Sequence, residues 1–263
     1  MNAENKQNLP ILTLENIHFS YHSLQGEVKT MEDISFSLKK GEFLAIVGPS
    51  GCGKSTLLNL ICGLLTPEKG KITFPLSGEN TSPKIGYMLQ HDHLFEWRTI
   101  YENVTLGLEI QKKKTPENLK RVNELLESYG LAEFTNKRPS ELSGGMKQRA
   151  ALIRTLALDP EILLLDEPFS ALDYQTRLMV SADIGKIIRK YEKTAILVTH
   201  NLSEAISMAD KVFVLSNRPS AIKAQFDIHL TITDDSLLAY RNAPEFQTYF
   251  NSIWEVLVDE TKK

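Results

Sequence analysis

The chain has 263 residues, 42% of them hydrophobic and 24% charged, so it can bury the core of one large domain. Its formal net charge of −3 shows no basic excess, which argues against nucleic acid as the main partner. The two cysteines, Cys52 and Cys62, lack metal-ligand spacing and are typical of a reduced cytosolic protein. The first ten residues are polar and no apolar run approaches roughly 20 residues, so we expect neither a secretory signal nor a transmembrane helix.

The first third of the chain combines strand patterns with one helix. Apolar and polar residues alternate from Leu12 to Tyr21 and from Ile34 to Leu38, which predicts two half-buried strands. The apolar run Phe43–Val47 predicts a buried strand, and a helical pattern after it extends to Thr66-Pro67. Two shorter strand patterns follow, at 71–74 and 84–88.

The middle of the chain, from 99 to 157, has helical spacing. One amphipathic face is formed by Leu119, Val122, Leu125 and Leu126. The lysine-rich stretch 111–116 is typical of an exposed loop between helices.

Strand patterns then resume at 162–165, 194–198 and 212–215, each followed by turn or helix signals. Parallel strands that alternate with helices indicate a wound α/β sheet, here with a helical insertion. A short alternating segment begins at about Ala224. The chain finishes with an amphipathic pattern formed by Phe246, Phe250, Ile253, Trp254 and Leu257.

A phosphate-loop pattern lies between a predicted strand and a predicted helix, which is the context that this motif requires. Its residues are Gly48, Pro49, Ser50, Gly51, Cys52, Gly53, Lys54, Ser55 and Thr56. The glycines let backbone N–H groups surround phosphate oxygens, and the helix N-terminus adds positive potential. Lys54 can reach the β- and γ-phosphates, and the Ser55 hydroxyl suits Mg²⁺.

The strand pattern 162–165 ends in two carboxylates, Asp166 and Glu167. Such a strand brings charge to the carboxyl edge of the sheet, where ligands bind in this class of fold. We expect Asp166 to hold Mg²⁺ through its water shell and Glu167 to act as the general base on an attacking water. The pattern is common by itself, and it becomes informative because a phosphate loop lies upstream.

A third motif, LSGGMKQR at 142–149, places Ser143, Gly144 and Gly145 at the start of a predicted helix. Exposed backbone N–H groups and a serine hydroxyl that points outward would form a second anion-binding site there. With this motif the chain resembles the ATP-binding subunits of ABC transporters over nearly its whole length. The resemblance implies an α/β fold with a phosphate-loop NTPase core, an antiparallel β subdomain and an α-helical subdomain. It also implies an ATPase domain over 10–245, with the helical subdomain at about 97–158, and a C-terminal helical tail over 246–263.

The resemblance further assigns roles to single residues. It implies that Tyr21 stacks on adenine, that Gln90 senses Mg²⁺ and the attacking water, and that His200 touches the γ-phosphate. The expected catalytic residues are Glu167, His200, Lys54 and Gln90, and the expected metal ligands are Ser55, Gln90 and Asp166. The usual Gln of the third motif is replaced by Met146.

The same resemblance predicts partners. Ser143–Gly145 would contact the γ-phosphate held by a second copy, so that two chains enclose two ATP molecules head to tail. The loop Ser170-Ala171-Leu172-Asp173 would communicate across this dimer. The expected cofactors are ATP and Mg²⁺, and the expected location is the cytoplasmic face of the membrane, as a peripheral subunit on transmembrane permease subunits.

Two other classes compete with an importer motor: a soluble ABC ATPase acting on DNA or the ribosome, and the motor of an exporter or lipoprotein-type complex. The single phosphate loop, the lack of a heptad array and the charge disfavour the first. The segments 94–100, 214–219 and 244–257 are similar to importers of nitrate, sulfonate, taurine and related small anions or thiamine precursors. Such importers work indirectly with a solute-binding protein and use no nucleic acid. Trp97 would either contact the permease or pack within the helical insertion.

Overall fold

A computed structural model describes residues 9–24, 26–77, 83–170, 172–232 and 237–261. The chain forms two compact units: Met1–Pro83 together with Ile188–Lys263, and Lys84–Ile187. The predicted helical segment 97–158 belongs wholly to the second unit. Ala171 of the predicted dimer loop and residues 262–263 of the predicted tail lie outside the described residues.

The first unit contains an antiparallel sheet with the strand order β2-β1-β4. Its strands are β1 (Leu12–Ser23), β2 (Gly26–Leu38) and β4 (Lys69–Thr73). Leu12 pairs with Leu38, and the two strands remain paired out to Ser23 and Gly26. The alternation that predicts β1 is visible as burial, since Leu12, Leu14 and Ile17 point inward.

The first unit also holds three parallel strands, β7 (Thr194–Val198), β3 (Phe43–Val47) and β8 (Lys211–Leu215). Every residue of β3 and β7 is buried, which explains their continuous apolar runs. The alternating segment near Ala224 is β9 (Ile222–Asp227), an antiparallel strand beside β8. The Phe36 and Phe213 rings meet edge to face at 5.4 Å and join the antiparallel sheet to this one.

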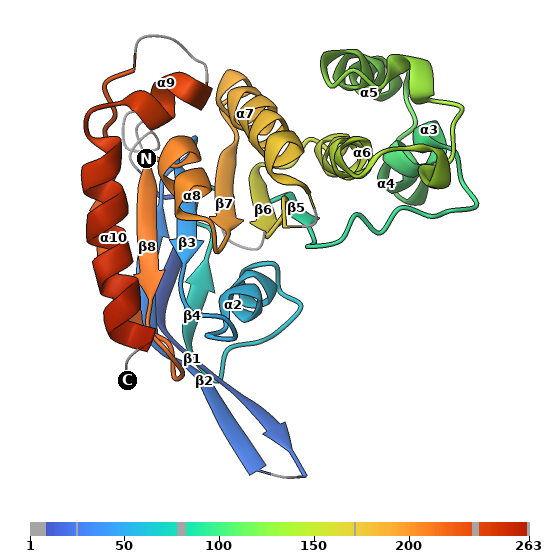
Figure 1. The fold of residues 1–263 in the computed structure, drawn as a ribbon. Coiled ribbons are helices and arrows are strands. Elements are labelled where there is room, and N and C mark those ends of the chain that lie inside the picture. Colours follow the sequence, from blue (N-terminus) through green and yellow to red (C-terminus); the bar gives the residue numbers. More distant parts are fainter. Residues whose placement is uncertain (1–8, 25, 78–82, 171, 233–236, 262–263) are drawn as a thin grey trace. The chain divides into compact units, whose positions relative to one another are not determined.

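Helices complete the first unit: α2 (Lys54–Ile61), α8 (Leu202–Met208), α9 (Leu237–Asn242), α10 (Phe246–Thr261) and the 3₁₀ turn η1 (Pro75–Ser77). The helical pattern predicts that α2 continues to Leu65, and this is wrong. Gly63 has a left-handed φ of 77°, which stops the helix. The amphipathic tail is α10, which buries Ile253 and runs alongside β8 (Figure 1).

The second unit pairs two parallel strands, β5 (Ile85–Met88) and β6 (Ile162–Asp166). Its helices are α3 (Ile100–Val104), α4 (Leu106–Ile110), α5 (Pro116–Ser128), α6 (Gly144–Leu156) and most of α7 (Tyr174–Lys190), with 3₁₀ turns η2 (Ala132–Phe134) and η3 (Pro139–Glu141). Figure 1 shows α3, α4 and α5 gathered around α6. Thr115 caps α5, and the lysine-rich stretch before it is exposed, as predicted. Among the described helices, none combines the length and apolar character needed to cross a bilayer.

Candidate functional site

The predicted phosphate loop lies in the first unit, between the end of β3 and the start of α2. The Lys54 ammonium donates to the carbonyl oxygens of Gly48 and Pro49, both at 2.9 Å, and the side chain is buried. Gly53 has a φ of 113°, and an added Cβ there would lie 2.9 Å from the Thr30 methyl group. The loop therefore needs glycine at position 53 for both conformation and space.

Tyr21, the residue expected to stack on adenine, lies at the same end of α2. Its hydroxyl is 3.2 Å from the Thr56 hydroxyl, and its ring meets Phe19 edge to face at 5.0 Å. The Tyr21 side chain is still 42% exposed. An aromatic surface is thus held beside the phosphate loop and remains open to a flat ligand.

His200 shares a sheet edge with the phosphate loop, because β3 and β7 are parallel neighbours and both segments follow their carboxyl ends. The turn that carries His200 is fixed on both sides. The Thr199 hydroxyl donates to Glu204 Oε2 at 2.7 Å, and the Asn201 side chain caps α8 by accepting from the Ser203 N–H at 3.0 Å. His200 itself is exposed at this edge.

The second unit brings Gln90 and the two predicted carboxylates to one edge in the same way. Because β5 and β6 are parallel and in register, the residues that follow them emerge together. Gln90 Nε2 donates to Glu167 Oε2 at 3.3 Å, and the Asp166 side chain is buried at the strand end. The Gln90 amide therefore contacts Glu167, and Asp166 lies at the end of β6, directly before Glu167, as the sheet pattern predicts.

Glu167 is also unusual in its backbone, which has a left-handed φ of 44°. Its carbonyl accepts from the Ser170 N–H at 3.2 Å and from the Ser170 hydroxyl at 3.0 Å. A non-glycine residue in this region costs of order 1–3 kcal/mol and persists where its surroundings enforce it. The turn after β6 thus holds Glu167 in one specific orientation.

The third motif begins α6, with Ser143 at the N-cap. The Ser143 hydroxyl accepts from the Met146 N–H at 3.4 Å, so it faces its own helix, whereas we expected it to point outward. The two glycines differ: an added Cβ at Gly145 would lie 2.5 Å from the Thr176 methyl group, but at Gly144 it would meet nothing closer than Leu172, at 3.6 Å. Gly145 is therefore required by packing against α7, while Gly144 lies on the exposed face.

One residue that sequence reasoning missed holds the segment after Gln90. Arg154, on α6, donates to the main-chain carbonyls of Asp92 at 2.6 Å and His93 at 2.7 Å. Burial lowers the pKa of the Arg154 guanidinium, which nevertheless stays charged. Because its partners are main-chain carbonyls, no residue type in the sequence indicates the contact.

Trp97 lies in a loop of the second unit that is held from within. The buried Asn103 side chain accepts from the Phe95 N–H at 2.7 Å and donates to the carbonyls of Phe95 at 3.1 Å and Thr99 at 2.9 Å. The Trp97 side chain is 71% exposed, and its ring lies 4.7 Å from that of Phe95. Trp97 therefore does not pack inside the helical insertion.

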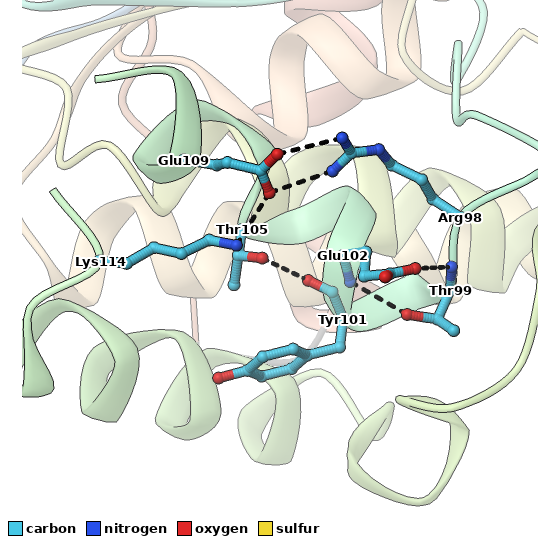
Figure 2. A network of polar contacts seen from close by, with 7 residues as sticks. All are labelled: Arg98, Thr99, Tyr101, Glu102, Thr105, Glu109 and Lys114. Atoms are coloured by element: carbon cyan, nitrogen blue, oxygen red, sulfur yellow. Dashed lines mark hydrogen bonds and ion pairs between the residues drawn. The ribbon is translucent and has the colours of Figure 1, made fainter. Parts of the chain in front are cut away.

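A charged network fixes the other side of this loop (Figure 2). Arg98 donates twice to Glu109, both at 3.1 Å, and Lys114 donates to the same carboxylate at 2.8 Å. These donors lower the pKa of Glu109 from its ordinary 4.5 to about 2, so the carboxylate is ionised at neutral pH. Thr99 and Glu102 form a reciprocal capping box at the start of α3.

The predicted metal ligands are oxygen donors of the kind that Mg²⁺ takes alongside water and phosphate. They are the Ser55 hydroxyl, the Asp166 carboxylate and the Gln90 amide oxygen. Within the described ranges there is no cluster of three or more His, Cys, Asp or Glu that could hold a metal ion. By its chemistry, each of these oxygens suits Mg²⁺ that is bound together with a phosphorylated ligand.

Comparison with known proteins yields one family. A family model described as ABC transporter matches residues 31–170. The uncharacterized ABC transporter ATP-binding protein YtlC of Bacillus subtilis (strain 168) is 44% identical over 252 residues, which are 95% of this chain and 96% of the relative. The taurine import ATP-binding protein TauB of Pelagibacter ubique is 39% identical, and the aligned region covers 89% of this chain and 90% of TauB.

Two further comparisons extend this similarity. The nitrate import ATP-binding protein NrtD of a Synechocystis strain is 36% identical and covers 94% of each chain. Among solved structures, the dimeric post-hydrolysis state of the ATP-binding cassette MJ0796, bound to ADP and Pi, matches with a TM-score of 0.71 at 29% identity. It covers 83% of this chain and 99% of that one. The shared architecture is the predicted α/β cassette, with its antiparallel and helical parts.

Proposed function

Because this chain belongs to the ABC transporter family and is an ATP-binding subunit with the ABC ATPase fold, we propose that it hydrolyses ATP to power a membrane importer. Relatives named for taurine and nitrate import resemble it over nearly their whole length. These relatives favour a small anion such as nitrate, sulfonate or taurine as the solute. A thiamine-precursor-like solute is the alternative, which rests on the sequence resemblance alone.

The observation that carries the proposal is the contact between Gln90 and Glu167, 3.3 Å apart at the carboxyl edge of β5 and β6. A carboxylate in that position can take a proton from a water that the neighbouring amide orients. Bound Mg²⁺, held by Ser55, Asp166 and Gln90, would supply positive charge that neutralises phosphate oxygens. The hydrolytic work of the chain's own residues is then positioning and proton removal.

We assign nucleotide binding to the phosphate loop and Tyr21. The loop N–H groups and Lys54 would bind the phosphates, the Tyr21 ring would stack on adenine, and His200 would donate to the γ-phosphate. The start of α6, Ser143–Gly145, where Ser143 and Gly144 are exposed, would complete the site of a second copy. Two chains would thus enclose two ATP molecules.

Substitution of Glu167 by Gln tests the hydrolytic assignment. The amide keeps the size of the side chain but cannot accept the proton, so we expect ATP turnover to fall roughly 100-fold or more while ATP binding is retained. Steady-state phosphate release and equilibrium binding measure the two effects. Glu161→Gln, which changes an exposed carboxylate just before the same strand, should leave both unchanged. Near-normal turnover in Glu167→Gln would remove Glu167 as the general base.

We further propose that the chain is peripheral, at the cytoplasmic face of the membrane, and docks on transmembrane permease subunits through the loop that carries Phe95 and Trp97. Both aromatic side chains are exposed, and the buried Asn103 side chain binds the main chain of the loop. An exposed aromatic pair on a loop that is hydrogen-bonded from within suits a helix-in-groove contact. A solute-binding protein would act on the permease rather than on this chain.

A further inference from the structure

The turn after β8 brings a second cation to the phosphate loop. Strands β3 and β8 are parallel neighbours, with Val47 opposite Val214, so the segments that follow them leave the same edge of the sheet. Arg218 Nε donates to the carbonyl oxygen of Gly51, 167 positions away in sequence. The Arg218 guanidinium also lies 3.7 Å from the point where a Gly51 side chain would begin.

We propose that Arg218 is a positioning residue for the phosphate loop, an inference that rests on the proposed ATP site. In a trans peptide the C=O and N–H groups point in opposite directions, so a donor on the Gly51 carbonyl fixes the direction of the Cys52 N–H. In the structure the Cys52 N–H donates to the Pro49 carbonyl at 3.3 Å, and the Lys54 ammonium contacts the same carbonyl, so Arg218 and Lys54 hold one turn of the loop. A charged donor on the Gly51 carbonyl also polarises the Gly51–Cys52 peptide and strengthens its N–H as a donor. Arg218 thus orients the loop and places a positive charge beside it, without contacting the reacting atoms.

The Arg218 turn is anchored on one side by Ser220. This residue is fully buried, and its N–H and hydroxyl both donate to the Thr30 carbonyl, at 2.9 and 3.1 Å. The Ser220 carbonyl accepts in turn from the Glu32 N–H at 3.0 Å. These bonds tie the turn to β2, the strand whose Thr30 also packs on Gly53 of the phosphate loop.

The C-terminal helix anchors the other side. The Glu260 carboxylate of α10 is buried; it accepts from the Asn217 N–H at 3.2 Å and lies 3.2 Å from the Lys223 ammonium. The Asn217 amide also donates to the Glu260 carbonyl. Because Asn217 directly precedes Arg218, the end of α10 sets where the guanidinium lies. We therefore connect the C-terminal helix to nucleotide affinity.

Nucleotide titration of the full chain tests the role of Arg218. For Arg218→Ala we expect the Kd for ATP and the KM to rise roughly tenfold, with kcat changed less than about threefold, because loop geometry is altered and the hydrolytic residues are not. Arg218→Lys should recover part of the affinity, since it restores charge next to the loop. Lys40→Ala, which removes an exposed cation elsewhere in the same unit, is the matched control. Arg218→Ala binding within about twofold of the wild type would overturn the assignment.

A double-mutant cycle tests the link to α10. If Glu260 acts through Arg218, Glu260→Ala should raise the Kd for ATP, and Arg218→Ala with Glu260→Ala should bind no worse than Arg218→Ala alone. Additive losses, or no loss with Glu260→Ala, would disprove the link. Thermal unfolding of each variant shows whether a loss of ATP affinity comes from a less stable fold. A wild-type chain that binds no ATP would instead contradict the proposed function.

Discussion

Tyr21 combines a fixed position with an open ring. Its hydroxyl is 3.2 Å from the Thr56 hydroxyl, yet 42% of the side chain is exposed. The hydrogen bond and the aromatic surface can be separated experimentally, because phenylalanine keeps the ring and loses only the hydroxyl. If Tyr21 stacks on adenine, the ring carries the affinity.

We therefore expect Tyr21→Ala to weaken ATP binding roughly tenfold and Tyr21→Phe to bind within about twofold of the wild type. Equilibrium binding of ATP and GTP measures this, and both nucleotides should respond alike because every base offers a flat face. Equal losses in the two variants would show that the hydroxyl matters and not the stacking surface.

At the scale of an element, the loop before α3 is shaped by contacts on both of its sides. The Asn103 side chain binds the main chain of the loop from within. On the surface, Arg98 donates two hydrogen bonds to Glu109 (Figure 2). Surface ion pairs contribute little by themselves, so the buried Asn103 carries more of the loop's order. A loop that is ordered before binding loses less entropy when a partner docks.

The docking proposal predicts that Trp97→Asp reduces recovery of the cognate permease, with affinity lowered roughly 30-fold, because a central tryptophan at an interface contributes about 2 kcal/mol or more. Pull-down from detergent extracts, followed by titration, provides the measurement. Trp254→Asp is the control, since Trp254 is an exposed tryptophan on α10. If Trp97→Asp and Trp254→Asp recover the permease equally, the docking surface lies elsewhere.

At the scale of the whole molecule, the two glycines of the third motif have different roles: Gly145 is needed for the fold, and Gly144 can be changed to test assembly with a second copy. Gly145 cannot accept a side chain, because Thr176 fills the space beside it. Gly144 has room for one, so a substitution there can change the exposed face while the fold is kept. Gly144 is thus the appropriate position at which to test the proposed two-chain, two-ATP arrangement.

In a Glu167→Gln background, which should retain ATP, we expect an ATP-dependent dimer. Adding Gly144→Asp should weaken it roughly tenfold or more, because the new charge would face the γ-phosphate held by the second copy. Light scattering coupled to size exclusion, with and without ATP, measures the dimer. Gln111→Glu adds the same charge on an exposed loop and should leave the dimer intact. A dimer that is insensitive to Gly144→Asp would rule out this face.

The sequence alone determined most of the elements and, within each unit, the sheet edge at which the candidate residues lie. Phe43–Val47 and Thr194–Val198 are strands because continuous apolar runs of that length can be buried on both faces of a parallel sheet. The position of Gln90 beside Glu167 follows from the same rule, because residues after neighbouring parallel strands share an edge. The roles of these residues remain predictions.

Only the tertiary structure decided which distant main-chain groups receive the charged and polar side chains. Arg218 on the Gly51 carbonyl and Arg154 on the Asp92 carbonyl are contacts to peptide groups, which every residue carries and no motif marks. The end of α2 also depended on the left-handed conformation of Gly63. Local periodicity determines elements because burial repeats with the helix or strand, but a contact between distant segments depends on how the whole chain packs.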